Sequence, residues 1–162
     1  MNVKGWRWNC QSPAALVYMP SAILIAGSED PSIAMKHIKP KEAHQYLRDH
    51  PDAVLIDCRS EIEYLFVGHP VGAHLVPWND GPDWGINPHF VGQVSKIASV
   101  NRPVVVICRS GQRSISAGQS LEQAGFSEVY NVLDGFEGPL DEGHHRNTVS
   151  GWRMEGLPWE QS

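Results

Sequence analysis

Residues 103–114 read PVVVICRSGQRS, an apolar run that ends in a cysteine and a short polar loop. An unbroken β-branched run of this length is typical of a central parallel strand that is buried on both faces. A helical pattern begins at Ser114 and closes at Gly125. Because ligands of open α/β sheets bind beyond the carboxyl ends of the strands, this pattern puts Cys108 where such proteins do chemistry.

The loop after the predicted strand favours a reactive sulfur at Cys108. The first N–H groups of a helix have no partner inside it, and a tight loop can aim further N–H groups at its centre. Arg109 and Arg113 add positive charge on either side of Gly111, which lets the backbone bend. Such surroundings lower a cysteine pKa from about 8.5 to as low as ~3.5–7.5. We therefore predict a nucleophilic thiolate in preference to a structural cysteine.

The rest of the chain, from Met35 onward, predicts one α/β domain. Short strands alternate with helical stretches, an order that builds a mainly parallel central sheet with helices on both faces. Ser60 is a plausible N-cap, with Glu63 at the capping-box position. We predict strands over 54–57, 73–76, 104–107 and 128–133, helices over 40–48, 61–67, 90–98 and from 114 to 124, and a loop over 79–88.

Several segments together resemble the rhodanese-type sulfurtransferases. Residues 108–113 look like the active-site loop of that family, and the similarity runs from about residue 35 to residue 159. Two positions depart from the pattern: Phe136 stands where a second glycine is common, and Pro70 where the family often has isoleucine or valine. The other matching segments are LIDCR (55–59), GHPVGA (68–73), DGF (134–136) and the closing segment with Trp152, Gly156, Leu157 and Pro158.

The resemblance implies sulfur transfer by double displacement, without a cofactor or a metal. Cys108 would take a sulfur atom from a small anionic donor such as thiosulfate, carry it as a persulfide and pass it to a thiol or a protein acceptor. A loop with two arginines resembles those suited to thiosulfate. The residues expected to bind the donor are Arg109, Ser110, Gly111, Gln112, Arg113 and Ser114.

Residues outside the loop receive supporting roles. Asp57 and Arg59 either position the catalytic loop or form a structural ion pair, and we favour the ion pair. Cys58 ends another predicted strand and could lie at the same edge of the sheet as Cys108. We expect it to be a core residue; the alternative is a resolving thiol. A pocket wall is expected from Trp78, Trp84 and Phe136.

Two other functions stay open. The first is a phosphatase or arsenate reductase of the rhodanese fold, which would have five residues between its cysteine and arginine. Here four residues separate Cys108 from Arg113, so the loop is narrower than an oxyanion of phosphorus needs. The second is a sulfur carrier or interaction module with little turnover.

The net charge and the N-terminal segment limit the partners and the cellular location that we expect. The chain of 162 residues has a net charge of −5 and no long basic tract, which argues against nucleic-acid binding. Its three cysteines do not suggest a disulfide framework. Residues 14–27 are apolar but too short to span a membrane. We expect an N-terminal extension (1–34) without an assigned role, a rhodanese-like domain (35–162) and a cytoplasmic location; export is the alternative if residues 1–27 act as a signal peptide.

Overall fold

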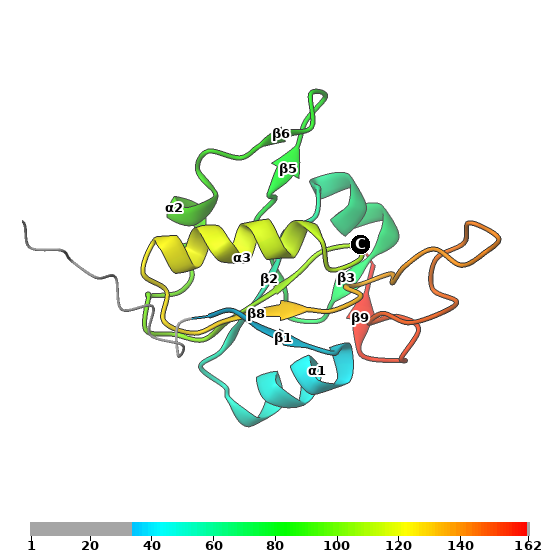
Figure 1. Cartoon of the computed structure of the whole chain (residues 1–162), viewed down its shortest axis with the longest axis horizontal. Coiled ribbons are helices and arrows are strands. Elements are labelled where there is room, and N and C mark those ends of the chain that lie inside the picture. Colours follow the sequence, from blue (N-terminus) through cyan, green and yellow to red (C-terminus); the bar gives the residue numbers. More distant parts are fainter. Residues whose placement is uncertain (1–33, 162) are drawn as a thin grey trace, which may run out of the picture.

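The computed structural model describes residues 34–161. Residues 1–33, and with them the signal-peptide alternative, lie outside this range. A five-stranded sheet forms the centre, in the order β1-β8-β7-β2-β4 (Figure 1). Every neighbouring pair in it is parallel, which confirms the predicted α/β class. The strands are β1 (Lys36–Ile38), β2 (Val54–Asp57), β4 (His74–Leu75), β7 (Val104–Ile107) and β8 (Val129–Val132).

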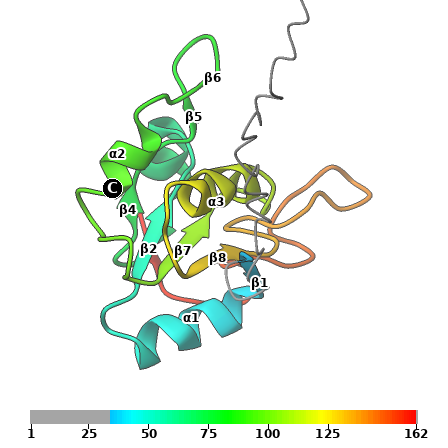
Figure 2. The ribbon, with the colours of Figure 1, turned by 60° about the vertical axis from the view of Figure 1, so that its left-hand side comes forward.

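Helices cover both faces of this sheet, as predicted. One face carries α1, and the other carries α2 and α3 (Figure 1 and Figure 2). None of the helices within residues 34–161 is long and apolar enough to cross a bilayer. The bounds are α1 (Pro40–Asp49), α2 (Phe90–Val94) and α3 (Arg113–Gln123), with a π-helical turn, η1, at Glu63–Val67.

The central strand β7 is buried on both sides because its residues alternate between two cores. Val104 and Val106 pack into the core shared with α2 and α3. Val105 and Ile107 pack into the core on the α1 side. All four are fully buried, which is why the sequence shows an unbroken apolar run instead of an apolar–polar alternation.

The structure differs from the sequence-based expectations at several short elements. The predicted loop over 79–88 contains a hairpin of β5 (Asn79–Asp80) and β6 (Gly85–Ile86), and the predicted strand over 73–76 shortens to β4. The predicted helix over 90–98 ends at Val94, because the N–H groups of Lys96 and Ile97 bond three residues back. The strands β1, β3 (His69–Pro70) and β9 (Trp159–Glu160) were not predicted, because each forms only with a distant partner. The strand β1 pairs with β8, and β3 pairs with β9.

Asp57 and Arg59 form a fully buried ion pair at the end of β2. The Arg59 guanidinium donates to both Asp57 carboxylate oxygens, with Nη2 to Oδ2 at 2.6 Å. It also donates to the Gly68 carbonyl at 2.7 Å and lies 4.2 Å from the centre of the Phe136 ring. The pair therefore ties the strand end to η1 and to the turn after β8, which fits the structural role that we favoured.

We predict that Asp57→Ala lowers the free energy of unfolding by about 3–5 kcal/mol, because it leaves the Arg59 charge buried without its carboxylate. Urea denaturation followed by circular dichroism measures this change. Glu128→Ala is the control for a partly exposed carboxylate: it removes the ion pair with Lys36 at 3.5 Å and the hydrogen bond from the Tyr130 hydroxyl, and it should cost about 1–2 kcal/mol. Equal losses in the two variants would contradict a special contribution of the buried pair.

Candidate active site

Cys108 lies at the carboxyl end of β7, between the sheet and the start of α3. Its sulfur accepts a hydrogen bond from the N–H of Gly111 at 3.2 Å and another from the hydroxyl of Ser114 at 3.2 Å. The residue is 1% exposed. The loop is thus curled around the sulfur atom, as the sequence indicated, and Ser114 adds a side-chain donor from the first turn of α3.

A second turn, residues 134–137, holds the loop 108–113 in this conformation. The N–H of Phe136 donates to the carbonyl of Cys108 at 2.8 Å, and the N–H of Glu137 donates to that of Arg109 at 2.9 Å. A Cβ atom on Gly135 would stand 2.3 Å from the Cys108 carbonyl oxygen, so only glycine allows this approach. These hydrogen bonds fix the position of the loop, in which the Gly111 N–H faces the sulfur.

These contacts favour the charged form of Cys108. The neighbouring Cys58 thiol is the largest influence on the pKa of Cys108 and lowers it, burial opposes this effect, and the Ser114 hydroxyl and the loop N–H groups reinforce it. Together they lower the pKa of Cys108 from 9.0 to about 5. At neutral pH the sulfur is therefore a thiolate, the form that acts as a nucleophile.

Glu63 is a site residue that the sequence analysis assigned only to helix capping. Ser60 and Glu63 do form the predicted capping box, with the Ser60 N–H donating to Oε2 at 3.0 Å. The same carboxylate also accepts two hydrogen bonds from Arg113, at 2.7 and 2.8 Å. The spacing within the sequence gives no signal of this pairing, because 50 residues separate the partners.

The Glu63–Arg113 pair is charged at all ordinary pH values. Burial raises the pKa of Glu63, but the hydrogen bonds from Arg113 and Ser60 outweigh it and lower the pKa to about 2. The Arg113 guanidinium also lies 5.4 Å from the centre of the Trp84 ring. Arg113 is thus held between a carboxylate and an indole, and it anchors the start of α3 to η1.

Arg109 is the more available cation of the loop. Its side chain is 47% exposed, and its Nε lies 4.0 Å from the Glu63 carboxylate. Gln112 is exposed as well, and Ser110 is half-buried. The residues predicted to bind the donor therefore gather around Cys108, but only some of them face solvent.

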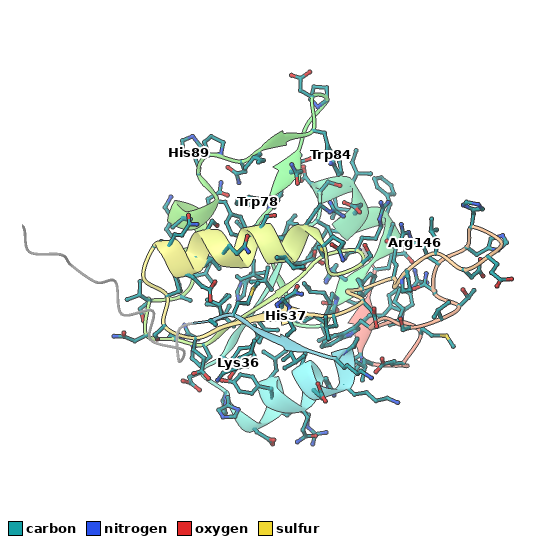
Figure 3. All side chains as sticks on the ribbon, viewed as in Figure 1. Lys36, His37, Trp78, Trp84, His89 and Arg146 are labelled. Atoms are coloured by element: carbon teal, nitrogen blue, oxygen red, sulfur yellow. The ribbon has the colours of Figure 1, made fainter. Side chains whose placement is uncertain are left out.

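The three predicted wall residues have different fates. Trp84 lies on the hairpin of β5 and β6 (Figure 3) and is 51% exposed. Its ring faces the Arg113 guanidinium, so it borders the site. Trp78 is half-buried and packs edge-on against Phe90, with ring centres 5.1 Å apart. The prediction for Phe136 is wrong: its side chain is fully buried under Arg59, where it fills the core instead of lining a pocket.

Cys58 is the other cysteine that the structure brings to the site. It follows β2 directly, and its N–H donates to the carbonyl of Ile107 at 2.9 Å. Both Cys58 and Cys108 are free thiols in the same buried core. The sequence places each cysteine at the end of a predicted strand, which is a signal that both lie at one edge of the sheet. That the two strands are neighbours depends on the strand order, which the sequence does not give.

Comparison with known proteins agrees with this geometry. The rhodanese-like domain family matches residues 39–141. The crystal structure of Rv0390 from M. tuberculosis superposes with a TM-score of 0.70 at 41% identity, covering 78% of this chain and 98% of that one. An uncharacterised protein of Rickettsia conorii is 30% identical over 79% of this chain and 99% of its own length.

A further relative is the chloroplastic thiosulfate sulfurtransferase 16 of Arabidopsis thaliana. It is 31% identical, over 78% of this chain and 88% of that protein. The extent of the family match, together with the loop curled around Cys108, leads to one conclusion. The chain belongs to the rhodanese-like domain family.

Proposed function

We propose that the protein is a sulfurtransferase that carries sulfane sulfur as a persulfide on Cys108, with thiosulfate or a similar small anion as donor. The observation that carries the proposal is the thiolate of Cys108, which accepts hydrogen bonds from Gly111 and Ser114 at the sheet edge. The relationship to a named thiosulfate sulfurtransferase adds support. We assign this activity to residues 35–162 and expect it in the cytoplasm, where free thiols persist.

In the first step, the Cys108 thiolate attacks the outer sulfur of thiosulfate. A sulfur–sulfur bond forms to Cys108, the bond between the two sulfur atoms of the donor breaks, and sulfite leaves with the electron pair. The negative charge passes to the persulfide, whose anion the same N–H and O–H donors can stabilise. No external oxidant or reductant is needed, so the chemistry requires no cofactor.

In the second step, a thiophilic acceptor removes the outer sulfur. The acceptor (cyanide in an assay, a thiol or protein thiolate in the cell) attacks that atom, and the Cys108 thiolate leaves. A low pKa of Cys108 helps here too, because a more stable thiolate is a better leaving group. The two steps restore the enzyme to its starting state.

We assign the direct contact with an anionic donor to Arg109. Its side chain is 47% exposed, and its Nε lies 4.0 Å from Glu63, beyond hydrogen-bond distance, so the guanidinium can turn to a sulfonate for charge-assisted hydrogen bonds. Both Nη atoms of Arg113 are already bonded to Glu63, which favours anchoring of the loop as the main contribution of Arg113. Ser110, Gly111 and Gln112 complete the loop around the bound donor.

The first test of this function is the covalent intermediate. We expect thiosulfate to raise the intact mass of the protein by one sulfur atom, and cyanide to reverse the gain. Cys108→Ser should not gain the sulfur, whereas Cys10→Ser should gain it fully. A Cys108→Ser protein that still takes up the sulfur would overturn the assignment.

The roles of Arg109 and Arg113 can be distinguished with one anionic and one uncharged sulfur donor. Arg109→Ala should lower kcat/KM for thiosulfate by ~10–150-fold, since a hydrogen bond to a charged group contributes about 1.5–3 kcal/mol. Its loss with an uncharged organic persulfide should be much smaller. Arg113→Ala should lose activity with both donors, because the loop loses its anchor. A donor-selective loss in Arg113→Ala, with none in Arg109→Ala, would reverse these roles.

The pH dependence of Cys108 alkylation follows from its lowered pKa. The thiolate is the form present above the pKa, so the rate should be constant at neutral pH and fall as the pH drops through about 5. Rapid-quench reaction with iodoacetamide, followed by mass analysis of the Cys108 peptide, measures the midpoint. A midpoint near the ordinary value of about 8.5 would show that the loop does not stabilise the thiolate.

A further inference from the structure

Cys58 and Cys108 occupy equivalent places at the ends of two neighbouring strands. Asp57 of β2 and Ile107 of β7 are partners in the parallel register, and each is followed by its cysteine. The N–H of Cys58 continues the ladder by donating to the Ile107 carbonyl. Adjacent strands lie about 4.7–4.9 Å apart, so the two cysteines are lateral neighbours.

Both side chains point to the same side of the sheet. Cys58 and Cys108 belong to the core that contains Ile56 and Val106, each two residues earlier in its strand. The side-chain period of two thus places the thiols together on the α3 side. Their exposed fractions are 0% for Cys58 and 1% for Cys108, so water does not compete strongly for contacts between them.

We propose that Cys58 is a positioning residue whose thiol donates a hydrogen bond to the Cys108 sulfur and holds it as a thiolate. Gly111 and Ser114 approach that sulfur from the loop and from α3. In the proposed arrangement, Cys58 adds a third donor from the end of β2. The proposal rests on the proposed function of Cys108 as the sulfur carrier.

The proton of this thiol pair belongs to Cys58. Burial raises the pKa of the Cys58 thiol well above its ordinary value, and the nearby Cys108 raises it further. The pKa of Cys108 is lowered instead, because donors surround it. At neutral pH the arrangement is therefore an uncharged S–H beside a thiolate, and a weak donor gains strength when its acceptor is charged.

This position suits both half-reactions. In the first, the hydrogen bond keeps Cys108 deprotonated until the donor arrives. In the second, it stabilises the thiolate that leaves when the acceptor takes the outer sulfur. Cys58 itself forms no bond to the transferred sulfur, so its contribution is distinct from that of a resolving thiol.

Three substitutions of Cys58 test the hydrogen bond. Cys58→Ser keeps a donor, Cys58→Ala removes it, and Cys58→Val removes it while filling the space. All are made in a Cys10→Ser background, and iodoacetamide alkylation of Cys108 is followed from about pH 4 to about pH 9. Thermal unfolding shows which variants are folded, and the serine and valine variants keep the test valid if the alanine variant is not.

We expect the alkylation midpoint to rise by about one pH unit or more in Cys58→Ala and Cys58→Val. In Cys58→Ser the midpoint should lie at least half of the way back to that of the protein with Cys58. A purely packing role of Cys58 would not produce this recovery. Unchanged midpoints in the folded variants would overturn the proposal, as would a serine variant shifted as far as the valine variant.

The readout separates this proposal from the proposed function. If thiosulfate loads Cys108 but the midpoints do not move, sulfur transfer stands and the role of Cys58 is refuted. If the midpoints move as expected but no sulfur donor loads Cys108, the hydrogen bond stands and the sulfurtransferase assignment fails.

Discussion

The parallel pairing of β2 with β7 is the constraint on which the rest of the site depends. Parallel strands end at the same edge of a sheet, so one register brings Cys108, Cys58 and the Asp57–Arg59 pair to that edge. The buried ion pair fastens the β2 end to η1 and to Phe136. Phe136 in turn donates its N–H to the Cys108 carbonyl, so the ion pair and the loop 108–113 share one framework.

The two arginines of the loop share the Glu63 carboxylate unequally. Glu63 balances Arg113 through two short hydrogen bonds, whereas Arg109 stands largely exposed at the rim. Together with the Cys108 thiolate, the four groups nearly cancel. The lowered pKa of Cys108 therefore has its main causes in the neighbouring Cys58 thiol and the Ser114 hydroxyl, not in an excess of positive charge.

The loop of the site combines backbone and side-chain donors. The carbonyls of Cys108 and Arg109 accept hydrogen bonds from the turn after β8. Gly135 allows the turn to come this close, because it has no Cβ atom to collide with the Cys108 carbonyl. The Gly111 N–H then faces the sulfur, supported by the Ser114 hydroxyl. In the sulfur transfer that we propose, such preorganised donors would need no rearrangement when negative charge moves between thiolate and persulfide.

The sequence by itself determined the parallel α/β class, the place of Cys108 and the composition of its loop. These follow from local patterns: the apolar run over 103–107, the glycine in the loop and the helix that begins beside it. It also indicated the Ser60–Glu63 capping box, because its two residues are three positions apart.

Only the tertiary structure decided which distant residues meet. Glu63 and Arg113 pair across 50 residues, Cys58 lies beside Cys108 because of the strand order, and Phe136 fills the core under Arg59 instead of a pocket wall. The tertiary structure also decided the short strands, which are β1, β3, β9 and the hairpin over 79–86. The physical reason is that short segments have little local preference, so long-range hydrogen bonds and packing choose their partners.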